Sequence, residues 1–293
     1  MKSNNLTHID NPNLDCFKAQ LSEKDFSDFS KFIYSEYGIK MPPIKRVMLQ
    51  GRLLKRIREL QMTCFSQYKE YFFSPEGQRK EILQFLNVIT TNKTDFFREP
   101  IHFNFLNDVI LPDKKNKGNN EIFKVWSAGC SSGEEPYTIS IVLNEYQTLN
   151  PLFKFEITCT DISTQVLEKA ARGIYPAAKI DEVPLHIKKR YFLKSKDAVN
   201  QTIKVNSVLQ RNLTFTYLNL MDNYTIPTNF DVVFCRNVLI YFDRETQEKV
   251  IQKICTFIKP GGYFFTGHSE SISGMNLPLE HIKPTIFKKS INK

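Results

Sequence analysis

The stretch Val125-Trp126-Ser127-Ala128-Gly129-Cys130-Ser131-Ser132-Gly133-Glu134-Glu135-Pro136-Tyr137 decides the fold of this chain. It reads as a strand, a loop bounded by Gly129 and Gly133, and a helix whose first turn holds Pro136, where a missing N–H does no harm. This arrangement opens a ligand pocket at the edge of an α/β sheet. The loop is not G-x-G-x-x-G, and carboxylates at a helix N-terminus would repel a pyrophosphate. Glu134 and Glu135 suit either a ligand that carries an ammonium group or simple complementation of the helix dipole.

Strands and helices alternate downstream of this stretch. Such alternation predicts a mostly parallel sheet with helices on both faces. We expect strands at 122–127, 153–159, 213–218, 231–235, 263–267 and 285–289, helices at 136–146, 163–172 and 245–258, and a turn at Gly261-Gly262. Residues 174–211 depart from the rhythm, since they hold Pro176, Pro184 and short alternating runs. They predict a small inserted antiparallel β-subdomain.

Residues 1–90 show helical periodicity, which predicts an all-α N-terminal domain before an α/β domain at 91–293. We expect helices from about Ser22 to Gly38 and at 42–61, 64–73 and 76–90. The second of these places apolar residues on one face, namely Val47, Leu53, Leu54, Ile57 and Leu60. Basic residues lie on the opposite face without acidic partners at i+4, namely Lys45, Arg52, Lys55 and Arg56. This basic face is either merely solvated or a docking face for an acidic partner helix.

Composition excludes several classes of protein. The chain of 293 residues carries a formal charge of +9, which favours an acidic partner or nucleic acid. Its six cysteines include no C-x-x-C pair and it has only five histidines, so we expect neither a disulfide framework nor a zinc site. We find no secretory signal and no apolar run of the ~18–20 residues that span a bilayer, and we expect a cytoplasmic protein without membrane insertion.

Polar residues follow three of the predicted strands, at the edge where an α/β sheet binds ligands. Asp161 follows the second strand and either accepts from ribose hydroxyls or caps a helix. Arg236, Asn237 and Tyr241 follow the fourth. These residues favour a cofactor that contains adenosine and an amino group but no phosphates. S-adenosylmethionine is such a cofactor. Upstream, the stretch from Thr91 to Glu99 adds a cationic clamp, and the combination predicts transfer of a group onto an anion.

Four motifs resemble the CheR family of chemoreceptor glutamate O-methyltransferases. They are Thr-Asn-x-Thr-x-Phe-Phe-Arg at 91–98, Trp-Ser-Ala-Gly-x-Ser-x-Gly-Glu-Glu-Pro-Tyr at 126–137, Phe-Cys-Arg-Asn-Val-x-Ile-Tyr-Phe-Asp at 234–243 and Gly-His-Ser-Glu at 267–270. The resemblance covers nearly the whole chain. It implies a Rossmann-like S-adenosylmethionine-dependent methyltransferase domain that esterifies receptor glutamates and yields S-adenosylhomocysteine without a metal.

The resemblance also implies roles for individual residues. Arg98 and Tyr241 would adjoin the reacting carboxylate as catalytic residues. The cofactor-binding residues would be Asn92, Thr94 and Arg98 at the methionyl end, Glu135 at the amino group, Asp161 at the ribose, and Asn219, Leu220, Arg236 and Asn237 around the adenine and the floor of the site. The basic helix would meet the acidic methylation helices of membrane-bound receptor arrays, and we expect a monomer.

One departure and two rival functions bear on this interpretation. Some family members bind a receptor C-terminal pentapeptide through a glycine-bearing β-loop, but residues 194–201 contain no glycine, which argues against this tether. Methyltransferases acting on nucleic-acid amines commonly carry Asn/Asp-Pro-Pro-Tyr/Phe after the fourth strand, where this chain has Arg236-Asn237-Val238-Leu239, so we expect no nucleic-acid substrate. An inactive cofactor-binding adaptor would be free to lose Arg98 and Tyr241, which are present.

Overall fold

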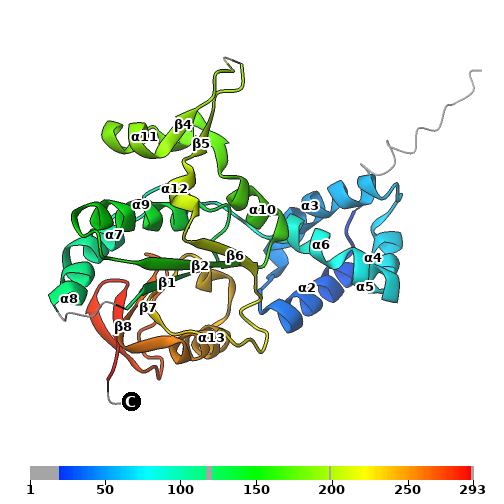
Figure 1. Ribbon diagram of the computed structural model, residues 1–293. Helices are drawn as coiled ribbons and strands as arrows, with labels where there is room; N and C mark the ends of the chain where they lie inside the picture. Colours follow the sequence, from blue (N-terminus) through cyan, green and yellow to red (C-terminus); the bar gives the residue numbers. More distant parts are fainter. Residues whose placement is uncertain (1–19, 117–120, 198, 292–293) are drawn as a thin grey trace, which may run out of the picture. The chain divides into compact units, whose positions relative to one another are not determined.

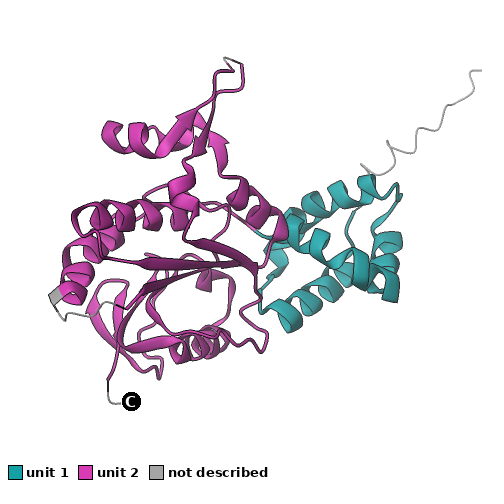
Figure 2. Ribbon diagram, in the orientation of Figure 1, with its two compact units in different colours: residues 1–90 teal, residues 91–293 magenta. Residues whose placement is uncertain are grey.

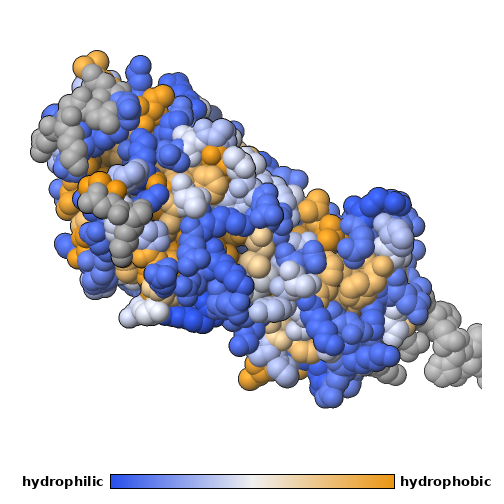
Figure 3. Space-filling model, turned by 90° about the horizontal axis from the view of Figure 1, so that it is seen from below, coloured by the Kyte–Doolittle hydropathy of each residue, from blue (hydrophilic) through white to orange (hydrophobic). Residues whose placement is uncertain are grey.

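The computed structural model describes residues 20–116, 121–197 and 199–291, and the chain divides into two compact units, residues 1–90 and 91–293 (Figure 2). Each unit is built around its own core. Among the described residues, no helix is both long and apolar enough to cross a membrane. On the face that Figure 3 shows, apolar residues lie in small groups between hydrophilic ones.

Unit 1 is helical, with the bounds α2 Glu23–Tyr37, η1 Pro43–Lys45, α3 Arg46–Glu59, α4 Phe65–Phe73, α5 Pro75–Lys80 and α6 Ile82–Ile89. Ser22 caps α2, since its hydroxyl accepts from the backbone N–H of Asp25. The core is aromatic: Phe29 packs on Phe72 at a ring-centroid distance of 5.6 Å, and Phe72 packs on Phe85 at 4.5 Å. The high phenylalanine content of the chain is thus partly explained by this core.

Two expectations for unit 1 are wrong. The expected helix at 76–90 is broken at Glu81, whose buried carboxylate accepts from Arg56 Nε and Nη2, at 2.7 Å each. On α3 the buried residues are Leu49, Leu53 and Ile57, whereas Val47 is exposed. The helix begins at Arg46, after η1, and Leu49 rather than Val47 completes the buried face, since it lies four residues before Leu53.

Unit 2 holds a mixed sheet in the order β6-β2-β1-β7-β8-β10-β9. The strands are β1 Phe123–Ala128, β2 Phe155–Asp161, β6 Leu213–Tyr217, β7 Phe230–Cys235, β8 Ile258–Thr266, β9 Leu279–Lys283 and β10 Ile286–Lys289. The first five in the order pair in parallel, and β10 and β9 add an antiparallel edge. The expected turn at Gly261-Gly262 is wrong, because β8 runs through both glycines, and Gly261 takes φ 75° at an irregularity in the strand.

Helices cover both faces of this sheet (Figure 1). On one face lie α7 Ile101–Phe105, the π-helical turn η2 Leu106–Ile110, α8 Leu111–Asn116, α9 Glu134–Leu149 and α10 Thr164–Arg172. The other face is covered by α13 Arg244–Thr256. The alternating side chains of β1 follow this division, since Val125 packs in the first core and Trp126 in the second.

The inserted segment forms a second, antiparallel sheet in the order β3-β5-β4. Its elements are β3 Ile174–Pro176, η3 Ala177–Ile180, α11 Leu185–Tyr191, β4 Phe192–Lys194, β5 Thr202–Val205 and α12 Ser207–Gln210. Tyr175, Tyr191 and Ile203 are buried with Tyr137 of α9, so the subdomain shares a core with the main sheet. The predicted fold class is therefore confirmed.

Candidate active site

Three strand ends meet at the site because β1 lies between β2 and β7. The loop after β1 folds back on β2, where the backbone N–H groups of Gly129 and Cys130 donate to Thr160 O at 2.8 and 2.9 Å. Gly129 has φ 81°, and a Cβ there would overlap the side chain of Val238. The sharp turn brings this loop to the edge of the sheet at which parallel sheets bind their ligands.

Asp161 fixes the glycine-bounded loop to the end of β2. One carboxylate oxygen accepts from the Ser131 N–H at 2.8 Å and the other from the Ser163 N–H at 2.9 Å. Burial raises the pKa of Asp161, against the lowering effect of these backbone hydrogen bonds. Ser163 itself caps α10. Asp161 therefore organises two loops, and its carboxylate accepts from the backbone N–H groups of Ser131, Ile162 and Ser163.

Arg236 is the centre of a buried charge cluster. Its side chain is 2% exposed, with Nη1 at 3.0 Å from Glu135 Oε2 and Nη2 at 3.1 Å from Glu99 Oε2. Nη2 also donates to Arg98 O, and the Ser127 hydroxyl donates to Glu135 Oε1 at 2.7 Å. Two carboxylates thus share one guanidinium. When both are ionised, the cluster carries an excess negative charge that one further cation would neutralise.

The two carboxylates differ in pKa. Burial raises the pKa of Glu135, only partly offset by the Arg236 guanidinium and the Ser127 hydroxyl. Burial also acts to raise the pKa of Glu99, but Arg236 and the backbone N–H of His268 outweigh it and lower the pKa. Glu99 is therefore the carboxylate of the pair that stays ionised to the lower pH.

The backbone around this cluster is strained. Phe97, Glu99, Ser131 and Asn237 have φ of 54°, 57°, 49° and 60°. A left-handed conformation costs a residue with a Cβ about 1–2 kcal/mol. Of the described residues, only Gln61 and Thr285 outside these loops share it without being glycine. Strain of this kind gathers at functional sites.

The segment that contains Asn92, Thr94 and Arg98 is held from three sides. Ser131 Oγ donates to Asn92 O at 3.0 Å, and Lys179 of η3 donates to Thr94 O at 2.6 Å. Arg98 Nη1 donates to Lys93 O at 3.0 Å. The Tyr241 hydroxyl donates to Thr91 O at 3.3 Å. The structure thus brings Arg98 and Tyr241 to the same short segment.

The remaining expected cofactor residues line the neighbouring strand ends. Asn219 and Leu220 follow β6 and are buried, and Leu218 N donates to Asp161 O at 3.0 Å, which holds this turn beside Asp161. Asn219 donates to Asp222 Oδ1 at 2.8 Å. Asn237 Nδ2 lies 3.4 Å from Glu99 Oε1.

Three residues of this site were missed by sequence reasoning. Glu270 accepts from the backbone N–H groups of Gly267, Asn237 and Ile240 and fixes the loop after β7. Glu270 ends the quoted motif at 267–270 and Glu99 directly follows the one at 91–98, which was a usable signal. His102 is fully buried, and burial together with Arg236 lowers its pKa to about 3, so that it is neutral. No spacing pattern pointed to it.

A cavity of about 1330 Å³ opens beside Arg98 within unit 2. Its walls come from residues 95–107, α9, η3 and α11. Polar and charged residues line it, among them Arg98, Lys179, Glu145, Glu182 and His186. Arg98 lines this cavity, whereas Tyr241 and residues 91–94 do not.

The structure changes the expected basic face of α3. Arg56 is 13% exposed and its guanidinium is paired with the buried Glu81, while Arg52 donates to the carbonyls of Ile89 and Thr90. Lys55 has an acidic i+4 partner, Glu59, at 3.9 Å, so the expectation of no such partner is wrong. Arg52 and Arg56 hold unit 1 together, and of the four residues only Lys55 is highly exposed.

Comparison with known proteins identifies both units. The family described as CheR methyltransferase, all-alpha domain, matches residues 24–90, and the CheR methyltransferase, SAM binding domain, matches residues 92–288. The chain is 37% identical to a chemotaxis protein methyltransferase of Borreliella burgdorferi, over 92% of this chain and 95% of that one. It is also 37% identical to the chemotaxis protein methyltransferase of Escherichia coli, over 87% of each chain. The chain belongs to the CheR methyltransferase family.

Proposed function

We propose that this protein transfers a methyl group from S-adenosylmethionine to the side-chain carboxylate of glutamates on chemoreceptor helices, forming glutamate methyl esters. The observation that carries the proposal is the meeting of Glu135, Asp161 and Arg236 at one edge of the sheet. The family supplies the S-adenosylmethionine-binding domain and the chemotaxis context.

The residues present fit this cofactor. Glu135 and Glu99 share a single buried guanidinium, so an ammonium group would balance the second carboxylate. Asp161 would hold the ribose through its carboxylate, and Asn219 and Leu220 would flank the adenine. The remainder of the cofactor would be enclosed by five further residues, Asn92, Thr94, Arg98, Arg236 and Asn237. The bound cofactor would supply an electrophilic methyl group on a sulfonium.

The chain's own residues need to orient the acceptor more than to activate it. A glutamate with a pKa near 4.3 is already an anion at neutral pH and needs no general base. Arg98 would fork onto the carboxylate and the Tyr241 hydroxyl would donate to it. Alignment of reacting atoms contributes up to ~7–11 kcal/mol in ideal cases. Too tight a clamp would stabilise the ground state, so the benefit lies in orientation.

The proposal includes a cytoplasmic enzyme that is recruited to membrane-bound receptor arrays, where its substrate is an acidic receptor helix. The exposed Lys55 and the half-exposed Lys45 of unit 1 are candidates for docking it. Arg52 and Arg56 support this surface from inside the unit rather than presenting their charge. We expect the enzyme to act as a monomer on protein and not on nucleic acid.

The test mixes the purified protein with methyl-labelled S-adenosylmethionine and receptor cytoplasmic domains. Label released as methanol by mild alkali identifies a glutamyl methyl ester. Arg98→Ala should abolish the label, while Arg211→Ala, which changes an exposed arginine after α12, should not. Cofactor binding without transfer to any receptor domain would contradict the proposal and favour an adaptor.

A further inference from the structure

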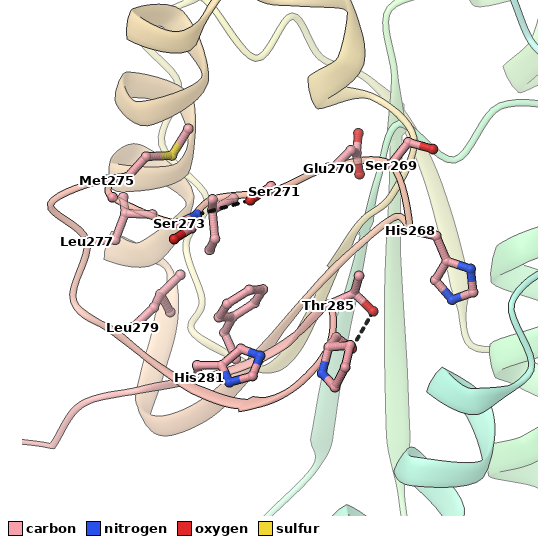
Figure 4. A pocket seen from close by; sticks show the side chains of 14 residues that line it. His268, Ser269, Glu270, Ser271, Ser273, Met275, Leu277, Leu279, His281 and Thr285 are labelled. Atoms are coloured by element: carbon pink, nitrogen blue, oxygen red, sulfur yellow. Dashed lines mark hydrogen bonds between the residues drawn. The ribbon is translucent and has the colours of Figure 1, made fainter.

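Three potential metal ligands converge beside the charge cluster, on the side away from Glu135. Glu99 Oε2 lies 3.6 Å from Nδ1 of His102 on α7 and 4.0 Å from Nε2 of His268, which follows β8. All three ligand atoms lie within 4.8 Å of one another. Figure 4 shows His268 pointing away from the cavity lined by residues 268–287, toward the neighbouring helix, and the His268 and His102 rings are 5.9 Å apart.

Hydrogen bonds to Thr285 decide where the proton of His102 sits. The Thr285 hydroxyl lies 2.6 Å from His102 Nε2 and 2.6 Å from Pro284 O. A hydroxyl has one hydrogen, and the carbonyl can only accept, so the hydroxyl donates to Pro284 O and accepts from Nε2–H. His102 Nδ1 then carries a lone pair directed at Glu99.

The lone pair on His102 Nδ1 faces another hydrogen-bond acceptor instead of a donor. Nδ1 is fully buried and has no hydrogen-bond partner within the part of the chain that the structure describes. A carboxylate oxygen of Glu99, also an acceptor, lies 3.6 Å from it. Two acceptors this close repel each other unless a cation lies between them.

The backbone is strained to hold this arrangement. Thr285 is β-branched and has φ 63°, a conformation that is an outlier for such a residue. Glu99 has φ 57°. Metal-ligating histidines commonly donate their second ring N–H to an outer partner that fixes the ring, and Thr285 has that relation to His102.

We propose that Glu99 Oε2, His102 Nδ1 and His268 Nε2 form a binding site for a divalent transition ion of the zinc type. Two imidazoles and one carboxylate, with water in the open position, are a ligand set that zinc accepts. The spacing of 99, 102 and 268 gives no recognisable zinc motif, because the third ligand comes from a distant strand end.

The ion would compete with Arg236 for Glu99. Arg236 Nη2 lies 3.1 Å from the same Oε2, so its charge weakens metal binding, and metal binding withdraws Glu99 from Arg236. Arg236 also positions Glu135, which would bind the amino group of S-adenosylmethionine if the proposed function is correct. On that basis, zinc binding at Glu99 should weaken the binding of S-adenosylmethionine. Reciprocal coupling requires the cofactor to weaken zinc binding by the same factor.

The experiment uses the tag-free, full-length protein and titrates it with Co²⁺, followed by visible absorption, and with Zn²⁺, followed by calorimetry. His268→Gln changes a largely exposed side chain and should weaken binding about tenfold or more. His281→Gln, a histidine on β9 at the same cavity, is the matched control and should bind like the wild type.

The metal titrations of the wild type and the two variants test the proposed site. One ion per chain, lost in His268→Gln and kept in His281→Gln, supports the site. No saturable binding, or equal loss in both variants, overturns it. Methylation is measured separately, so a protein that binds zinc but methylates no receptor keeps the metal site and loses the proposed function. Zinc binding that leaves cofactor affinity unchanged refutes the competition for Glu99.

Discussion

Arg236→Met tests whether the buried charge cluster has the energetics that its geometry implies. Methionine keeps an unbranched apolar side chain but loses the guanidinium, whose carbon lies 5.4 Å from the ring centroid of Phe103. The substitution removes the charge-assisted hydrogen bonds to Glu99 and Glu135 and leaves both carboxylates without a counterion. Breaking a buried ion pair from one side costs about 3–5 kcal/mol.

Chemical denaturation and thermal unfolding measure this loss. For a unit the size of residues 91–293, about 2–4 °C per kcal/mol gives a fall in Tm of about 6–20 °C. The exposed i,i+4 pair Lys249–Glu245 provides the control, and Lys249→Met should cost about 0.5 kcal/mol or less. A loss below about 1 kcal/mol in Arg236→Met would refute the reasoning.

The pH dependence of this variant gives an independent check. Without Arg236, the folded pKa of Glu99 should rise above that of the unfolded chain, and the pKa of Glu135, already raised by burial, should rise further. The folded state then holds its protons more tightly, so this stability is fully present below the unfolded pKa, near 4.3, and is lost as pH rises from there through the raised folded pKa. The difference between Arg236→Met and the wild type should therefore shrink as pH falls through the raised folded pKa values toward about 4.3. A difference that does not change with pH would mean that the carboxylates are not the cause.

Three further predictions concern single residues. Arg98→Ala should nearly abolish turnover in the methyl-transfer assay, and a rate like that of the wild type would refute its assignment as a catalytic residue. Tyr241→Phe should lower kcat more than it weakens cofactor binding, and the reverse pattern would make Tyr241 a cofactor residue. In unit 1, Ser22 and Lys69 hydrogen-bond Asp25 and outweigh burial, so its pKa lies below 3.8; this stabilisation is present above that value and lost as pH falls through the folded pKa. Asp25→Asn should therefore flatten the acid limb of the stability curve, and an unchanged limb would contradict the assignment.

The parallel strands around the site could be predicted because each is a short apolar run followed by a polar residue. The end of β2 at Asp161 and of β7 before Arg236 put those residues at one edge by topology alone. The break at Glu81 could not be predicted, because it depends on an ion pair with Arg56, 25 residues away. The same holds for β8, where neighbouring strands keep Gly261 and Gly262 in the sheet.

The candidate site was predictable where residues follow strands and hidden where they meet across the chain. Glu99 and Arg236 are separated by 137 positions, and no spacing rule connects them. His102 belongs to no motif and no predicted helix or strand, and only the hydroxyl of Thr285 reveals the direction of its lone pair. Helix α7, which carries His102, was not predicted, since five residues give too little periodicity.

The left-handed residues at the strand ends set stability and activity against each other in evolution. Ser131→Gly would relieve about 1 kcal/mol of backbone strain, so a selection for heat resistance alone would favour it. The same change removes the hydroxyl that tethers Asn92 and frees the segment on which Arg98 and Tyr241 converge. Heat-adapted relatives should therefore gain their stability elsewhere, in the aromatic core of unit 1 or along β8. The loops with the strained, left-handed backbone should stay unchanged in them.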